Sequence, residues 1–392
     1  MLDLVLKPGR EKPILRRHPW VMSGAVADVG SGDETPGAWT RVLSSGGRVL
    51  GYGDYSPASN IRVRMFCFGS EAPADGFLAG RIADAVARRS GDPLVGDTNA
   101  VRLVNAEGDG LPGLIVDRYD DVAVVKLTTA GMAARRDAIA SAIREATGAG
   151  CGFERADTTA ARREGMAIHD GTLWGELARG PIPIRERDRC FRVDVEAGQK
   201  TGFYLDQRDS RDLVSILSRG KRVLDLFSYT GGFAVAAARG GAADVTLVDS
   251  SGPALERARE HLAENAPGCQ AAFEKANAFE LLRASSDAYD LLVLDPPPLA
   301  RRRADVPRAS RAYKDLLLHG LARAAPGARI LVFACSHHVG PELFAKIVFG
   351  AALDAGRSVR VLRDLGTAAD HPVSVDHPEG RYLTGLLLEV DC

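Results

Sequence analysis

From about Cys190 onward, the chain repeats a pattern that few folds can accommodate. Short, strongly apolar runs alternate with stretches of about a dozen residues that have helical periodicity. Continuous apolar runs are typical of strands covered on both faces, and strands that alternate with helices are typical of a mostly parallel sheet. We therefore predict a doubly wound α/β domain. Its expected strands are Arg222–Phe227, Val245–Asp249, Ala271–Lys275, Leu291–Asp295 and Arg329–Ala334.

The first half of the chain has a different character. Leu2–Leu6 and Ile61–Phe66 alternate apolar and polar residues, and Gly and Ser clusters lie between them, which predicts a small β-barrel. Pro73 and Gly76 indicate a boundary, after which helical and strand patterns mix without a catalytic motif. We predict a multidomain protein with a β-barrel at 1–72, a central α+β domain at 73–187 and an α/β domain at 188–392.

Composition narrows the classes of partner and compartment. Lys and Arg total 50 against 51 Asp and Glu, a net charge of −1, so any nucleic-acid site must be a local patch. There is no signal-peptide pattern, and no apolar run approaches the roughly 20 residues of a membrane span. No two cysteines form a CxxC pair. We expect a cytoplasmic protein with reduced thiols and no membrane partner. The cysteines are Cys67, Cys151, Cys190, Cys269, Cys335 and Cys392.

The sharpest local motif surrounds the first of these strands. Asp225 lies in the strand, and Gly231 and Gly232 form a tight turn from which a helix starts. Ligands of open α/β sheets bind beyond the carboxyl ends of the strands, and glycine lets the backbone approach them closely. The next strand ends in Asp249, a residue that can accept hydrogen bonds from ribose hydroxyls. The chain contains no G-x-G-x-x-G and no phosphate-binding P-loop motif, so the pattern favours a nucleoside without a pyrophosphate.

Two later strands end in candidate catalytic residues. Asp295 precedes two prolines that fix the backbone, and Cys335 lies at the tip of the following strand. A thiolate that adds to C6 of a cytosine makes C5 nucleophilic, and Asp295 can contact the pyrimidine at N3 or the amino group. The alternative for Cys335 is a small apolar filler. The pair His337–His338 lacks further ligands at a suitable spacing, so we predict no metal site.

The segment that follows the Asp-Pro-Pro turn is basic. It carries six cations against one acid, Asp305. Such a patch beside an active site suits contacts with RNA phosphates, and a solvated loop is the alternative. The cations are Arg301, Arg302, Arg303, Arg308, Arg311 and Lys314.

These motifs resemble those of known methyltransferases. The pattern D-x-F-x-x-x-G-G-F from Asp225 to Phe233 resembles motif I of the class I S-adenosylmethionine (SAM)-dependent enzymes. The whole chain is similar to the RlmI family of 23S ribosomal RNA 5-methylcytosine methyltransferases. The segments that carry this resemblance are Gly108–Arg118, Gly198–Arg211, Phe227–Phe233, Tyr313–Asp315, Ala369–Val373 and Pro378–Gly380.

The resemblance implies an organisation and a set of site residues. The barrel is expected to be a PUA-like RNA-binding domain, and the last domain a Rossmann-like class I methyltransferase that binds SAM. Cys335 is the implied nucleophile, Asp295 its catalytic partner, and large-subunit ribosomal RNA the implied substrate of a monomer or homodimer. The implied cofactor residues are Tyr204, Asp206, Gln207, Asp225, Phe227, Ser228, Tyr229, Thr230, Gly231, Gly232, Asp249, Ser250, Asn277, Ala278 and Asp295.

Other functions stay open at this point. The chain departs from the family pattern at Pro298, Leu299 and His337, around the expected base, and at Asn277, near the expected adenine. A methyltransferase of the same fold that acts on another RNA or on a small molecule is the first alternative. A non-catalytic RNA-binding protein is the second, although the pattern at Asp225 and Asp249 favours a retained cofactor site.

Overall fold

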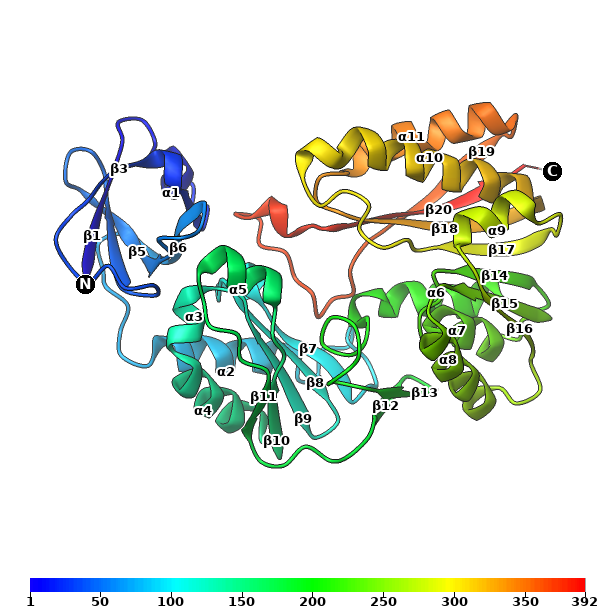
Figure 1. The fold of residues 1–392 in the computed structure, drawn as a ribbon, viewed down its shortest axis with the longest axis horizontal. Helices are drawn as coiled ribbons and strands as arrows, with labels where there is room; N and C mark the ends of the chain where they lie inside the picture. The colour runs from blue at the N-terminus through cyan, green and yellow to red at the C-terminus, as the bar shows by residue number, and fades with distance from the viewer. Residues whose placement is uncertain (392) are drawn as a thin grey trace. The chain divides into compact units, whose positions relative to one another are not determined.

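The computed structural model describes residues 1–391, and the C-terminal Cys392 lies outside the described residues. The chain forms two compact units, shown as a ribbon in Figure 1. The first contains Met1–Ile184, Val193–Leu205 and Ala369–Gly380; the second contains Arg185–Arg192, Asp206–Ala368 and Arg381–Cys392. No helix in the described part of the chain has the length and apolar character needed to cross a membrane.

The first unit begins with the predicted small β-structure. Its six-stranded sheet has the order β2-β6-β5-β4-β1-β3, in which β1 pairs with β4 in parallel and with β3 antiparallel. Leu2, Leu4 and Leu6 alternate along β1 and are fully buried, which is why this strand forms where the sequence alternates. The elements are β1 (Leu2–Leu6), α1 (Lys12–Leu15), β2 (Trp20–Met22), β3 (Val26–Val29), β4 (Trp39–Leu43), β5 (Val49–Tyr55) and β6 (Ile61–Phe68).

An α+β part completes the first unit. A five-stranded sheet of order β11-β10-β9-β8-β7 packs against α2 and α4, and its core includes Ile82, Val116 and Ile143. The elements are α2 (Phe77–Arg89), β7 (Ala100–Asn105), β8 (Leu114–Tyr119), β9 (Val122–Leu127), α3 (Ala130–Ala134), α4 (Arg136–Thr147), β10 (Cys151–Glu154), α5 (Thr158–Glu164) and β11 (Gly171–Trp174). A two-stranded sheet of β12 (Ile182–Glu186) and β13 (Arg189–Val193) follows.

The second unit is the predicted doubly wound domain, and this fold class is confirmed. Its seven-stranded sheet has the order β16-β15-β14-β17-β18-β20-β19, parallel except for β20. Figure 1 shows α9, α10 and α11 on one face of the sheet and α6, α7 and α8 on the other. The helices are α6 (Arg208–Leu217), α7 (Gly232–Arg239), α8 (Gly252–Asn265), α9 (Ala278–Ala284), α10 (Val306–Arg323) and α11 (Pro341–Ala355). The strands are β14 (Arg222–Leu226), β15 (Asp244–Asp249), β16 (Gln270–Lys275), β17 (Tyr289–Leu294), β18 (Ala324–Cys335), β19 (Val359–Leu365) and β20 (Leu383–Val390).

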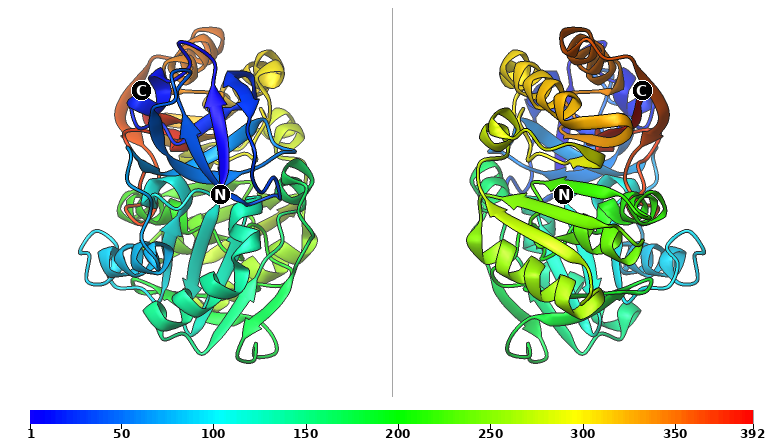
Figure 2. Two further views of the ribbon diagram at one scale, coloured as in Figure 1. Left: turned by 90° about the vertical axis from the view of Figure 1, so that its left-hand side faces the viewer. Right: turned by 90° about the vertical axis from the view of Figure 1, so that its right-hand side faces the viewer.

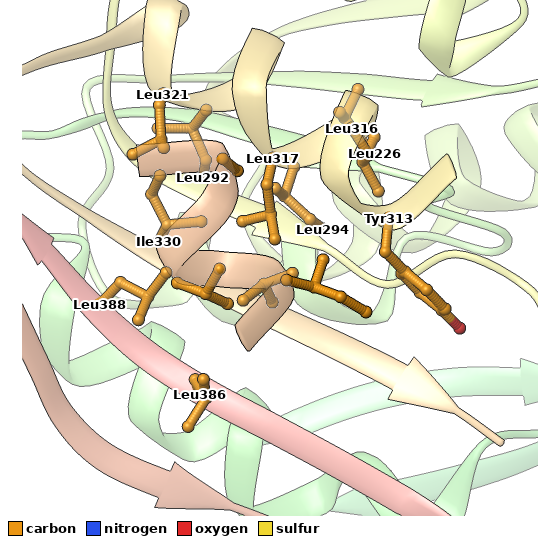
Figure 3. Close-up of a cluster of buried hydrophobic side chains, with 14 of the residues drawn as sticks. Leu226, Leu292, Leu294, Tyr313, Leu316, Leu317, Leu321, Ile330, Leu386 and Leu388 are labelled. Carbon is orange, nitrogen blue, oxygen red and sulfur yellow. The ribbon is translucent and has the colours of Figure 1, made fainter. Parts of the chain in front are cut away.

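Leucine-rich packing fixes this sheet under its helices. Figure 3 shows side chains of β14, β17, β18 and β20 meeting those of α10. Leu292 and Leu317 are fully buried in this cluster. Burial of one such side chain contributes about 1.5–3 kcal/mol, so the cluster holds the ends of the central strands in register. Those ends carry the predicted site.

Candidate active site

Four of the predicted site residues lie where the strand order of the second unit reverses. The chain runs outward from β14 through β15 and β16 on one side, and then returns to β17 on the other. This reversal point is where open α/β sheets bind ligands, beyond the carboxyl ends of the strands. Asp225 lies near the end of β14, Asp249 ends β15, Asp295 directly follows β17 and Cys335 ends β18.

The turn after β14 has an unusual backbone. Phe227 and Tyr229 have φ values of +63° and +48°, a region that non-glycine residues seldom occupy, and Gly231 follows at +77°. A side chain at Gly231 would bring its Cβ to 2.9 Å from the Cβ of Ala258 in α8. Glycine is therefore required at Gly231 by both conformation and space. Thr230 lies in the same turn and Gly232 is the first residue of α7, and both are partly exposed.

Asp249 holds this turn in place. One carboxylate oxygen accepts a hydrogen bond from the backbone N–H of Tyr229 and the other from that of Ser251, both at 2.8 Å. Hydrogen bonds from backbone N–H groups to a carboxylate are charge-assisted and stabilise an otherwise strained turn. Each carboxylate oxygen retains a further acceptor position. The side chain can therefore orient the turn and still accept hydrogen bonds from the hydroxyl groups of a ligand.

Asp225 is fully buried under the same turn. One of its oxygens accepts the N–H of Ala234 in the first turn of α7 at 3.0 Å. Burial, together with the nearby Asp295 and Asp249 carboxylates, raises the pKa of Asp225 well above its usual range. Because the three acids at this edge repel one another when ionised, a cationic ligand that relieves this repulsion is favoured.

The structure also reveals a residue that sequence reasoning missed. His261 of α8 is fully buried, and its Nδ1 lies 2.9 Å from the carbonyl oxygen of Thr230. Its Nε2 accepts the backbone N–H of Arg192 at 2.9 Å. Because Nε2 is the acceptor, Nδ1 carries the proton and donates it to Thr230. Burial lowers the pKa of His261 and keeps the ring neutral. A lone histidine in an amphipathic helix gives no sequence signal of such a role.

Asp295 links the cofactor side of the site to Cys335. The Cys335 thiol lies 3.5 Å from one oxygen of the Asp295 carboxylate, at hydrogen-bond distance for sulfur. The side-chain amide of Gln207 donates to the other oxygen at 3.1 Å. Both Asp295 and Cys335 are partly exposed, whereas Gln207 is buried. The carboxylate is thus fixed by Gln207 on one side and can accept the thiol proton on the other.

A SAM-like ligand fits the polar atoms at this edge. Within residues 1–391, a carboxylate oxygen of Asp225, the hydroxyl of Ser228 and the side-chain oxygen of Gln207 are buried without a hydrogen-bond partner. Buried polar atoms in folded proteins are almost always paired, so unpaired ones at a ligand edge indicate a missing donor. An ammonium group and hydroxyls supply donors, and the three acids match a positive charge.

The remaining predicted cofactor residues divide into several groups. Asp206 is buried and accepts the Tyr382 hydroxyl at 2.5 Å, while Tyr204 belongs to the first unit and donates to Gln199 at 2.5 Å. Ser250 is exposed just after β15. Asn277 caps α9 by accepting the N–H of Phe279 at 3.0 Å, and Ala278 is buried behind it.

The basic segment is only partly available to a polyanion. Arg302 forms an ion pair with Asp305 at 3.3 Å, and Lys314 forms one with Asp354 at 2.7 Å. Two of the six cations counted from the sequence are therefore already neutralised by neighbouring acids. The other four cations are exposed and have no ion-pair partner among residues 1–391: Arg301, Arg303, Arg308 and Arg311.

Two groups of histidines lie close enough together to be compared with metal ligands. The rings of His337 and His338 have centroids 3.8 Å apart and are tilted by 46° to each other. A different group in the first unit, His18, His377 and Glu379, brings three ligand atoms within 4.8 Å. There, the Nδ1 of His18 accepts the backbone N–H of Trp20 at 3.2 Å, so its Nε2 carries a proton and faces Glu379 as a donor. This arrangement is a hydrogen-bonded trio in which His18 is in the wrong tautomer for a metal.

Comparisons with known proteins agree on the class of fold. A family model described as S-adenosylmethionine-dependent methyltransferase matches residues 175–372, and one described as PUA-like domain matches residues 4–68. A protein from Shewanella amazonensis named ribosomal RNA large subunit methyltransferase I is 42% identical over 99% of both chains. A Salmonella arizonae protein of the same name is 39% identical over 99% of this chain and 97% of its own length.

Solved structures give the same fold. A crystal structure of a protein described as a methyltransferase complexed with SAH superimposes with a TM-score of 0.85 at 22% identity, covering 99% of this chain and 100% of that chain. A structure described as a SAM-dependent methyltransferase from Streptococcus mutans gives a TM-score of 0.83 at 22% identity, with the same coverage of both chains.

Proposed function

Because the chain belongs to the ribosomal RNA large subunit methyltransferase I family, whose members are SAM-dependent methyltransferases with a PUA-like domain, we propose that it methylates C5 of a cytosine in large-subunit ribosomal RNA. The cofactor is SAM, which supplies an electrophilic methyl group. The observation that carries the proposal is the contact of 3.5 Å between Cys335 and Asp295, next to the turn that follows β14.

The proposed role of the second unit toward the cofactor follows from its polar atoms. Asp249 would accept hydrogen bonds from the ribose hydroxyls of SAM. The buried oxygens of Asp225 and Ser228 would accept hydrogen bonds from the ammonium group of its methionine part. Asn277, already bound to Phe279 through its oxygen, retains an amide group near the expected adenine. The three acids together favour the positive charge of a sulfonium.

Cys335 and Asp295 then perform the chemistry on the base. Asp295 accepts the thiol proton, and the Cys335 sulfur forms a bond to C6 of the cytosine. Asp295 passes that proton to N3, so that the electron density of the ring moves to C5 and C5 takes the methyl group. Water takes the C5 proton, the electron pair of that bond restores the C5–C6 double bond as the C6–sulfur bond breaks, and the N3 proton returns to the cysteine thiolate. The net change is replacement of one hydrogen by a methyl group.

Charge near the site supports an RNA substrate. Arg301, Arg303, Arg308 and Arg311 are exposed and carry no ion-pair partner in the described residues. Arginine is well suited to phosphate oxygens because its planar guanidinium donates two parallel hydrogen bonds. A base in folded RNA must be unstacked before C6 becomes accessible, and backbone contacts of this kind hold such a strand.

The proposal is tested by methyl transfer from labelled SAM to unmodified large-subunit ribosomal RNA, followed by digestion to nucleosides and mass identification. Small-subunit ribosomal RNA and transfer RNA serve as comparison substrates. We expect label in 5-methylcytidine from the large-subunit RNA alone. Label in another nucleoside would overturn the cytosine-C5 assignment, and label only in a comparison RNA would overturn the substrate assignment. No label in any RNA, with SAM still bound, would favour a small-molecule substrate.

A further inference from the structure

The Gln207 side chain begins a row of polar contacts that crosses the candidate active site. Its Nε2 donates to one oxygen of the Asp295 carboxylate at 3.1 Å, and the Cys335 thiol lies 3.5 Å from the other oxygen. Gln207 immediately precedes α6, Asp295 follows β17, and Cys335 ends the adjacent strand β18. Figures 1 and 2 show α6 in green and the two strands in yellow to orange, all in the second unit.

The backbone is held on both sides of Gln207. Before it, the Asp206 carboxylate accepts a hydrogen bond from the Tyr382 hydroxyl at 2.5 Å. After it, Arg208 is fully buried and lies 3.6 Å from the Glu186 carboxylate. A response of Gln207 to a ligand is therefore confined to its side chain.

The amide oxygen of Gln207 has no hydrogen-bond partner. A carboxylate oxygen accepts but does not donate, so the amide nitrogen faces Asp295 and the oxygen points elsewhere. Gln207 is 2% exposed, and its Oε1 is buried without a partner among residues 1–391. An unpaired buried acceptor is unfavourable, so without a ligand the amide gains by turning its oxygen toward a donor. Because the amide is planar, that turn also takes Nε2 away from Asp295.

The cofactor side of the site has further acceptors of the same kind. Strand β14 pairs with β17, so Asp295 lies next to the turn that follows β14. At this turn, Asp225 and Ser228 also have buried oxygens without a partner among the described residues. Several unpaired acceptors at one edge fit a ligand with several donors, as the ammonium group and hydroxyls of SAM provide. A donor on Oε1 would hold the amide of Gln207 with Nε2 on Asp295.

We propose that Gln207 is a positioning residue that makes the reactivity of Cys335 depend on an occupied cofactor site. With a donor of the bound cofactor on Oε1, Gln207 holds one oxygen of Asp295, and the other oxygen stays on the thiol and accepts its proton. In the empty site the amide turns, and Asp295 is held less firmly. A ligand shifts such an equilibrium by its different affinity for the two arrangements, and the hydrogen bond to Oε1 supplies that difference. The inference rests on the proposed function, in which Cys335 is the nucleophile.

This dependence would prevent an unproductive reaction. If Cys335 added to C6 of a cytosine while the cofactor site was empty, no methyl donor would be present for C5. The sulfur–C6 bond could then only break again, with the proton on N3 returning to the thiolate. Coupling through Gln207 keeps the thiol less reactive until the methyl donor is bound.

The test measures how fast Cys335 reacts with iodoacetamide, with and without SAH, which is SAM without its transferable methyl group. The thiolate displaces iodide, and peptide mass spectrometry distinguishes Cys335 from the other cysteines. Any shielding of the thiol by SAH is common to all variants, so the comparison between variants is the measure. We expect the ratio of the rates with and without SAH to be roughly fivefold to tenfold higher in the wild type than in Gln207→Met, the effect of one hydrogen bond. Gln270→Met, the same substitution on the exposed strand β16, is the matched control and should behave like the wild type.

Isothermal calorimetry with SAH precedes these measurements, so that all rates are compared at saturation. Gln207→Asn keeps an amide but is one methylene shorter, so it should also lose the enhancement, and it decides the question if Gln207→Met does not bind SAH. An equal ratio in the wild type and in a Gln207 variant that binds SAH would overturn the proposal. Loss of SAH binding in both variants would also overturn it, because Gln207 would then be a cofactor contact alone. The assay contains no RNA, so its failure is distinguishable from failure of the methyl-transfer experiment.

Discussion

The Asp249 side chain has two roles, one in holding the turn and one proposed in binding the ligand. It holds the N–H groups of Tyr229 and Ser251, and it faces the ligand edge at the end of β15. Asp249→Ala should weaken SAM binding roughly tenfold to a hundredfold, because it removes a charged acceptor and loosens the strained turn. Isothermal calorimetry with SAM measures this directly. Asp244→Ala, at the other end of the same strand and paired with Arg222 on the surface, is the control and should bind SAM like the wild type.

His261 makes the stability of the folded chain depend on pH. Burial depresses its pKa in the folded chain, so the stabilisation it provides is complete above the pKa of the unfolded state and is lost as the pH falls. His261→Gln should reduce the free energy of unfolding by about 2 kcal/mol at neutral pH, because a buried hydrogen-bonded group is lost.

The same variant should also flatten the pH dependence. We expect the fall in stability between about pH 7.5 and about pH 5.5, measured by urea unfolding, to be smaller in His261→Gln than in the wild type. His319→Gln, which replaces a partly exposed histidine of α10, is the control for the loss of a buried group and should change the free energy of unfolding at neutral pH by less than about 1 kcal/mol. An equal slope in His261→Gln and the wild type would refute the role of this ring.

At the scale of elements, we expect the exposed arginines before and within α10 to bind RNA phosphates, and this can be tested separately from catalysis. Reversal of Arg301 and Arg303 to Glu should weaken RNA binding and reduce the steepness of its salt dependence, because each phosphate contact releases counterions. Filter binding of large-subunit ribosomal RNA at several salt concentrations provides the measurement. Arg302→Glu reverses one charge at a residue already paired with Asp305, and its effect should be less than half that of the double variant. A salt slope that is unchanged in the double variant would mark the segment as an ordinary solvated loop.

The elements also show what the sequence could and could not reveal. The strands that end in Asp249, Asp295 and Cys335 are apolar and regular, and parallel strands bring their carboxyl ends to one edge, so this convergence is predictable. Strands β19 and β20 are not recognisable in the same way, because β19 has charged residues on both sides of its apolar centre. The hydrogen bond of His261 to Thr230 depends on packing between helix and turn, which no local pattern encodes.

At the scale of the whole molecule, the chain passes between its two units several times. Val193–Leu205 and Ala369–Gly380 belong to the first unit although they lie within the expected 188–392 domain, and Arg185–Arg192 belong to the second. Asp206 and Tyr204 are therefore assigned to different units despite being two residues apart. Composition and hydrophobic periodicity depend only on residues that are close in the sequence. They therefore cannot predict which segments of the chain belong to which unit.

Glu186 lies in the segment Arg185–Arg192 and forms a buried ion network that stabilises the second unit. Although burial opposes its ionisation, Arg211, Arg189 and Arg208 hold the pKa of Glu186 below its usual value. Arg211 contacts it at 2.5 Å and Arg208 at 3.6 Å, and both are buried. Glu186→Gln should lower the free energy of unfolding by about 3–5 kcal/mol, because buried guanidinium groups lose their counter-ion.

Urea unfolding of the full chain measures this loss. Asp188→Asn removes the exposed partner of Arg239 in the same segment and should cost less than about 1 kcal/mol. Since the pKa of Glu186 is depressed, the stability that it provides is present at neutral pH and is lost as the pH falls into the acidic range. A Glu186→Gln variant as stable as Asp188→Asn would show that the ion network is dispensable.

The covalent role of Cys335 is tested most directly with large-subunit ribosomal RNA transcribed with 5-fluorocytidine. Fluorine at C5 cannot leave as a proton does, so the cysteine–C6 bond persists after methyl transfer. With SAM, the wild type and Cys269→Ala, which removes another partly exposed thiol of the same unit, should form a protein–RNA species that survives denaturing electrophoresis. Cys335→Ala should form none and should still bind SAM. An adduct in Cys335→Ala, or none in the wild type while ordinary RNA is methylated, would contradict nucleophilic catalysis by Cys335.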